Sequence, residues 1–94
     1  MDKENVKAVI ANLENEFDTH KFIEKFYSMY EKEYVELLYS RIDSTNGIFR
    51  ATHSEIGKYL ANNAPSLEIQ KMEKVESENI KKYDSENQKW RKTV

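Results

Sequence analysis

The chain has 94 residues, with 15 Lys and Arg against 17 Asp and Glu, 38% hydrophobic residues and no Cys. A chain of this size has room for one hydrophobic core, so we expect a single domain over residues 1–94. No segment approaches the roughly 20 apolar residues that span a bilayer, and the first residues lack the basic-then-apolar order of a secretory signal. We therefore expect a cytoplasmic protein that does not contact membranes.

Residue types exclude several kinds of chemistry. Without Cys there is no disulfide, thiolate zinc site or cysteine nucleophile. The two histidines, His20 and His53, lack the close spacing of a catalytic zinc nucleus, and Gly47 and Gly57 do not form a phosphate-binding loop. No serine lies in a Gly-x-Ser-x-Gly sequence. We expect no enzymatic activity, no catalytic or metal-binding residue, no cofactor and no small-molecule substrate.

Charge is uneven along the chain, although the formal net charge is only −2. Residues 1–47 carry six Lys or Arg and ten Asp or Glu, whereas residues 48–94 carry nine and seven. Because phosphate binding needs a local excess of cations, any nucleic-acid surface is expected in the second half.

The first predicted element is an amphipathic helix over 3–16. Asp2 is suited to cap its start, and Asp18 is suited to cap the next helix. The apolar residues recur at intervals of three and four, which places them on one face of a helix; they are Val6, Val9, Ile10, Leu13 and Phe17.

Residues 22–42 are the most apolar part of the chain and form the predicted centre of the core. Up to Tyr30 the apolar positions fit one helical face, but Val35, Tyr39 and Ile42 fall outside it. We therefore predict helices near 19–30 and 33–43, separated by a break near 31–33. The turn formers that follow Ile42 end with Gly47, which suits a left-handed helix cap.

Thr52-His53-Ser54-Glu55 has the pattern of a capping box and predicts a helix near 53–63. Pro65 ends it, because proline cannot continue the hydrogen-bond ladder. The stretch Thr52–Leu60, with its capped Thr-x-x-Glu-Ile start and following Leu, resembles helices of helix-turn-helix domains. That resemblance covers about a dozen residues and implies a helix that could read DNA.

Two structures remain open after Pro65. As a helix, 66–80 places Ile69, Met72 and Ile80 on one stripe. As extended chain, Leu67–Gln70 alternates and Gln88–Lys92 could pair back as a hairpin. We favour the helix. The predicted fold is thus mainly α, a compact bundle of four to five short helices, with a short C-terminal β-hairpin, as in a winged helix-turn-helix domain, as the alternative.

The leading functional hypothesis is a small non-catalytic protein-binding module or regulator, which binds a protein partner or self-associates. Tyrosine is enriched in interface centres, and the three residues of outlying helical phase could stay uncovered in a monomer. The predicted contact residues are Tyr27, Tyr34, Val35, Tyr39 and Ile42.

The alternative hypothesis is a winged-helix DNA-binding protein. It would use the 52–63 helix and the basic C-terminus, where cations alternate with aromatic rings that could stack on bases. The predicted nucleic-acid contacts are His53, Lys58, Asn62, Asn63, Lys89, Trp90, Arg91 and Lys92.

Overall fold

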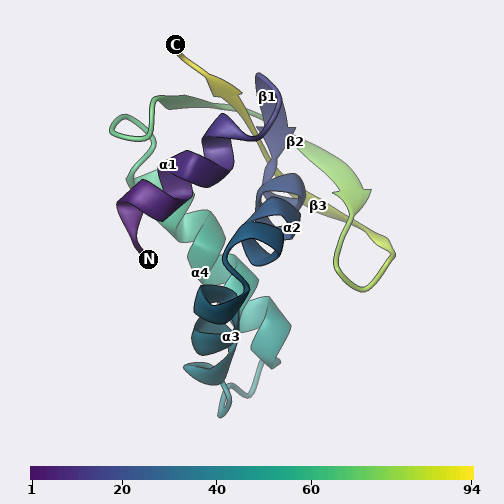
Figure 1. Ribbon diagram of the computed structural model, residues 1–94. Coiled ribbons are helices and arrows are strands. Elements are labelled where there is room, and N and C mark those ends of the chain that lie inside the picture. The colour runs from purple at the N-terminus through teal and green to yellow at the C-terminus, as the bar shows by residue number, and fades with distance from the viewer.

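The computed structural model describes all of residues 1–94 and has an α+β fold (Figure 1). Its elements follow in the order α1 (Lys3–Ala11), β1 (Glu16–Asp18), α2 (Thr19–Met29), α3 (Glu31–Tyr39), α4 (Ile48–Asn62), β2 (Ile69–Glu78) and β3 (Asp84–Lys92). The prediction of a mainly α bundle is wrong, because three strands form an antiparallel sheet in the order β1-β3-β2.

The first two helices begin where their caps predict. The Asp2 carboxylate accepts a hydrogen bond from the backbone N–H of Asn5, and Asp18 accepts one from that of Lys21. α1 ends at Ala11 rather than near residue 16, since residues 16–18 extend to pair with β3. A break does separate α2 from α3, but it lies at Tyr30 rather than near 31–33, and α3 ends at Tyr39 rather than near 43.

The predicted capping box does not start a helix. α4 begins at Ile48, four residues before Thr52, and Gly47 precedes it with φ of +96°. Thr52 lies inside the helix with 1% of its surface exposed, where it packs in the core. The predicted end is correct, because α4 stops at Asn62, shortly before Pro65.

The helix favoured over 66–80 is also wrong. Residues 69–78 form β2, which pairs with β3 from Ile69 opposite Lys92 to Glu78 opposite Asp84, with an irregularity between Lys71 and Lys74. The hairpin alternative describes this region. The short strand β1 pairs with the other edge of β3, so the hairpin and β1 form one three-stranded sheet.

The core lies between the helices and the sheet. Helices α1, α2 and α4 contribute side chains that are almost fully buried, including Val6, Phe22 and Leu60, and β3 contributes Trp90, which is 1% exposed. Figure 1 shows that the hairpin curves along one side of the helices, while α3 and the first turns of α4 extend beyond it. No helix has both the length and the apolar character needed to cross a membrane.

Thr19 joins the sheet to α2 at a buried point. The indole N–H of Trp90 donates to Thr19 Oγ1 at 3.1 Å, and the threonine hydroxyl donates to the carbonyl of Gln88 at 3.0 Å. The shape-conserving substitution Thr19→Val leaves the buried indole N–H without an acceptor. We expect a loss of about 1–3 kcal/mol in the free energy of unfolding, measured by urea denaturation.

The control is Thr45→Val in the exposed α3–α4 loop, which should change the free energy of unfolding by less than about 0.5 kcal/mol. Equal losses in the two variants would show that the Thr19 hydroxyl does not fix the hairpin.

Candidate functional site

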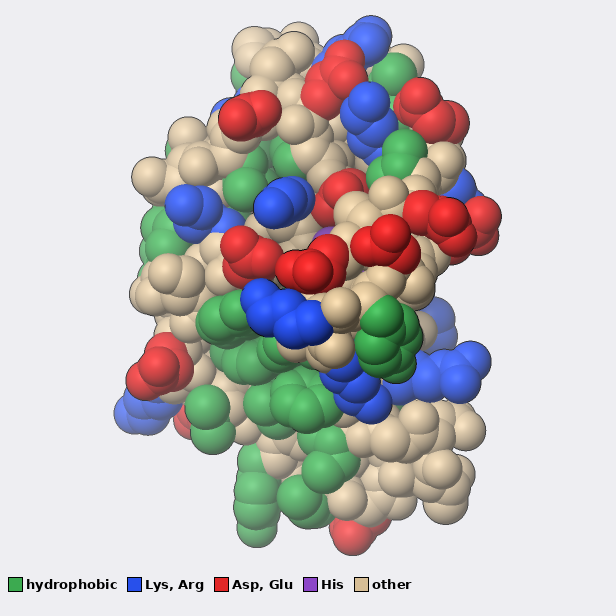
Figure 2. Space-filling view, turned by 90° about the vertical axis from the view of Figure 1, so that its right-hand side faces the viewer, with side chains coloured by type: hydrophobic (Ala, Val, Ile, Leu, Met, Phe, Trp, Pro, Cys, Tyr) green, Lys and Arg blue, Asp and Glu red, His purple; other side chains and the backbone are tan.

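Three exposed apolar residues follow one another along α3 and the turn after it. We call Val35, Tyr39 and Ile42 the α3 ridge; they are 54%, 74% and 52% exposed. Val35 and Tyr39 lie one turn apart, and the backbone N–H of Ile42 donates to the carbonyl of Tyr39, so the chain keeps turning after α3. Figure 2 shows hydrophobic side chains gathered over the lower part of the molecule, where Figure 1 places α3 and the start of α4.

Two further exposed apolar residues, which the sequence did not single out, lie at the ends of the neighbouring helices. Met29 at the end of α2 and Phe49 at the start of α4 are 37% and 39% exposed. Met29 lines a shallow hollow beside α3 together with Lys32 and Glu36, and the volume of this hollow is about 540 Å³. Phe49 was missed because the helix predicted near 53–63 begins after it.

The predicted contact residues Tyr27 and Tyr34 lie behind the ridge. Tyr34 is 5% exposed and packs edge-on against Phe26 of the core, so it contributes no contact area. Tyr27 is half-buried, with its ring centre 5.4 Å from that of Tyr34. These rings hold α3 against the core instead of facing solvent.

Tyr34 also binds His53 of α4. The tyrosine hydroxyl and His53 Nε2 are hydrogen-bonded at 2.6 Å, and the two rings stack with centres 5.9 Å apart. Burial, and then the nearby charge of Tyr27, raise the pKa of Tyr34 to about 12. Burial, and then the nearby His20, lower the pKa of His53 to about 4. Both groups are therefore neutral at pH 7.

Most of the predicted nucleic-acid contacts are occupied within the chain. Lys89 and Arg91 both bind Glu16 of β1, at 3.0 Å and 2.8 Å. Hydrogen bonds first from Lys89 and then from Arg91 lower the pKa of Glu16, and the same carboxylate raises the pKa of Lys89. The Lys92 ammonium donates to the carbonyl of Leu13 at 2.6 Å.

The remaining predicted contacts divide by exposure. Trp90 is buried and His53 is bound to Tyr34, so neither ring is free to stack on a base. Asn63 is partly buried, and its side chain donates to the carbonyl of Tyr59. Among these remaining residues, only Lys58 and Asn62 are exposed.

A polar hollow of about 670 Å³ lies between the outward face of α4 and the α3–α4 loop. Arg50, Ser54 and Lys58 line it from α4 at intervals of four residues, so they form one stripe. Arg50 and Lys58 form no intramolecular ion pair, whereas Arg41 at the edge binds Glu55.

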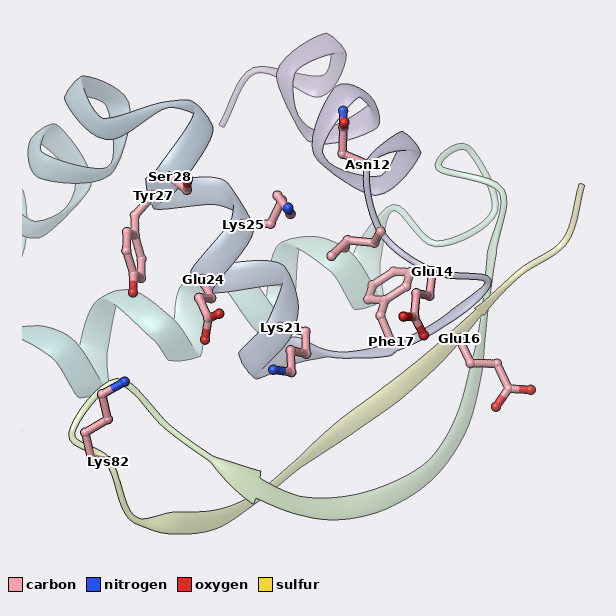
Figure 3. A pocket seen from close by; sticks show the side chains of 11 residues that line it. Asn12, Glu14, Glu16, Phe17, Lys21, Glu24, Lys25, Tyr27, Ser28 and Lys82 are labelled. Carbon is pink, nitrogen blue, oxygen red and sulfur yellow. The ribbon is translucent and has the colours of Figure 1, made fainter.

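A second hollow, of about 610 Å³, lies over α2 between the start of β1 and the hairpin (Figure 3). Lys21 and Glu24 of α2 point toward the hairpin, Lys82 reaches in from the hairpin turn, and Glu16 points away. Its charges are of both signs, and no group of three or more His, Asp or Glu side chains in the molecule is placed to hold a metal ion.

Comparison of the chain with protein-family models, with curated proteins and with solved structures gives no match.

The buried His53 predicts a pH dependence of stability. The pKa of His53 is about 4 in the folded chain and 6.5 unperturbed, so between these values the unfolded chain binds more protons. Stability is therefore lost as pH falls from 6.5 to 4. After allowance for solvent screening at this partly exposed ring, we expect a loss of about 1–2 kcal/mol in the free energy of unfolding.

The contribution of His53 to this pH dependence is the difference in the free energy of unfolding between wild type and His53→Gln, measured by urea unfolding at several pH values. Glutamine keeps a hydrogen-bond acceptor for Tyr34 but does not titrate in this range. If both proteins lose the same free energy over this range, the dependence does not arise from His53.

Proposed function

We propose that the protein is a non-catalytic protein-binding module whose contact surface is the α3 ridge, extended by Met29 and Phe49. The observation that carries the proposal is the exposure of the ridge, since more than half the surface of each of its three residues is open to solvent. Contiguous apolar surface of this kind is typical of protein interaction sites. We also propose a cytoplasmic location, because the chain has no cysteine for a disulfide.

The packing behind the ridge supports a binding role. Tyr34 anchors α3 in the core, and Phe26 and His53 hold its ring from two sides. The ridge is therefore presented by a fixed helix, and binding would order few groups beyond the side chains themselves. Tyr39 suits an interface because its ring buries apolar area while its hydroxyl can bind a polar group of the partner.

The test compares two exposed tyrosines. Tyr39 is 74% exposed on the ridge and Tyr83 is 59% exposed at the hairpin turn. A protein retained from a lysate by immobilised wild type should be lost with Tyr39→Ser and kept with Tyr83→Ser. With the retained protein purified, calorimetry should give a dissociation constant at least about ten-fold higher for Tyr39→Ser.

Circular dichroism of both variants should match wild type, since the two side chains lie outside the core. Retention that is equal for Tyr39→Ser and wild type would contradict the proposal.

A second candidate function is nucleic-acid binding through the outward face of α4. The observation that favours it is the order of elements, in which α4 precedes the hairpin as the reading helix does in winged helix-turn-helix domains. Arg50, Ser54 and Lys58 are exposed on that face, with Asn62 near its end. In this proposal the residues on α4 take the place of Lys89 and Arg91 as phosphate contacts, because those two cations are paired with Glu16.

If this function is correct, the chain binds mixed-sequence duplex DNA at low salt. Replacing Arg50 and Lys58 with Gln should weaken binding and reduce the slope of log affinity against log salt by about two, because two phosphate contacts are lost. Fluorescence anisotropy measures both quantities, and Lys7→Gln on α1 is the control. An unchanged salt slope in the double variant would rule out this face.

A further inference from the structure

The α3 ridge has the residue spacing of a helix–helix contact. Val35, Tyr39 and Ile42 follow one another at intervals of four and then three residues, which is the repeat of the seam along which one helix packs on another. All three side chains are exposed, so no helix of the chain itself covers this seam. The ridge is therefore matched in spacing to a helix of a partner.

The residues that flank this seam are acidic. Glu31 and Glu36 lie on either side of it in α3, and Asp43 follows Ile42 in the turn. All three carboxylates are exposed, and none forms an ion pair within the chain. In paired helices the charges beside the seam select the charge of the partner. Three unpaired carboxylates favour a partner with cations at the facing positions.

The hollow beside the first half of α3 has the same sign of charge. Its volume is about 540 Å³, and Met29 and Tyr30 form its apolar part. Its charged lining has one positive and four negative groups, a net charge of −3, and consists of Lys32 with Asp2, Glu31, Glu33 and Glu36. A Lys or Arg side chain suits this hollow, because its methylene stem can lie on Met29 while its cation reaches Glu31 or Glu36.

We propose that the α3 ridge binds a basic amphipathic helix of another protein. The apolar side chains of that helix pack on the ridge, and its Lys or Arg side chains pair with Glu31, Glu36 and Asp43. This inference rests on the proposed protein-binding function and names the chemistry of the partner. A second copy of the chain does not meet this requirement, since its own α3 carries the same carboxylates and the two helices would oppose like charges.

The probes are three fluorescent peptides of about 14 residues, which is two heptads. The first has Leu at the seam positions and Lys at the flanking positions, and the second has Glu in place of those Lys residues. The third has the composition of the first in an order that forms no apolar face. Anisotropy at low salt should give the first peptide a dissociation constant at least about ten-fold lower than either of the others. Absence of binding by the first peptide, or equal binding of any other, would overturn the inference.

Two double variants locate the charge that attracts the peptide. Replacing Glu31 and Glu36 with Gln should raise the dissociation constant of the first peptide at least about five-fold and reduce its dependence on salt. The matched control replaces Glu14 and Glu76 with Gln, because these carboxylates are also exposed and without an ion pair. Both variants change the net charge by the same amount. Equal weakening in the two would overturn the inference, since the attraction would then come from the charge of the whole chain.

The basic helix and the binding function fail separately. If the first peptide does not bind but a protein from a lysate is retained through Tyr39, the basic helix is excluded and the binding function stands. If nothing binds in a way that depends on Tyr39, both are excluded. Light scattering identifies the remaining occupant. A mass that rises with concentration from 11.2 kDa toward twice that value in wild type, but not in Tyr39→Ser, would place a second copy on the ridge and overturn the basic helix.

Discussion

The fold depends on one buried hydroxyl group, that of Thr19, which joins the sheet to the helices. It accepts from the Trp90 indole and donates to the carbonyl of Gln88, so both bonds connect β3 to the first residue of α2. The next residue continues the link, since the backbone N–H of His20 donates to the Asn87 side chain. Because β3 is the central strand, this contact also positions β1 and β2, which pair with its two edges. A hairpin as polar as this one would not be stable by itself in water.

The position of the sheet determines which helices are covered. The hairpin packs against α2, and its turn reaches the side of α4 near His53, so the surfaces of these helices become core. α3 lies beyond the hairpin and is held on its inner side by Tyr34, with Leu37 and Leu38 also packed against the core. Its Glu33 carboxylate also accepts a hydrogen bond from the Asn5 side chain of α1. Its outer side has no element of the same chain to pack on. The exposed ridge is therefore a consequence of a sheet too short to cover four helices.

The sequence predicted elements whose signals are local and missed those that depend on distant pairing. Asp2 and Asp18 cap helices through bonds to residues three positions away, and Asn62 to Pro65 end α4 in the same local way. The strand over 69–78 has its apolar residues at helical intervals, and only Ile69 at its start is buried, so its pattern does not alternate. Its conformation comes from pairing with β3. At the open end of the hairpin, from Ile69 to Lys74, each paired residue of β2 has a β3 partner that lies 14 or more positions later in the chain. The three-residue β1 likewise exists only because β3 lies beside it.

In the candidate site, too, the sequence predicted what depends on local signals and missed what depends on distant residues. The outlying phase of Val35, Tyr39 and Ile42 predicted their exposure, because helical phase is set by the chain itself. Tyr34 could not be assigned to the core from its neighbours, since its partner His53 is 19 residues away on another helix. The pairing of the basic C-terminal residues could not be predicted either. Lys89 and Arg91 share the single carboxylate of Glu16, which the β1–β3 register places opposite Arg91.

The two proposed surfaces meet on α4. Phe49 is an exposed apolar residue that extends the proposed protein-binding surface, whereas the adjacent Arg50 begins the polar stripe that continues to Lys58. Consecutive helix residues differ by about 100° in direction, so a partner that covers Phe49 leaves most of the outward stripe open. A domain with net charge −2 and two unpaired cations on this stripe is weakly suited to phosphate by itself. If both proposals are correct, the α3 ridge and the polar stripe would be open to different partners, because they point in different directions from the helices that carry them.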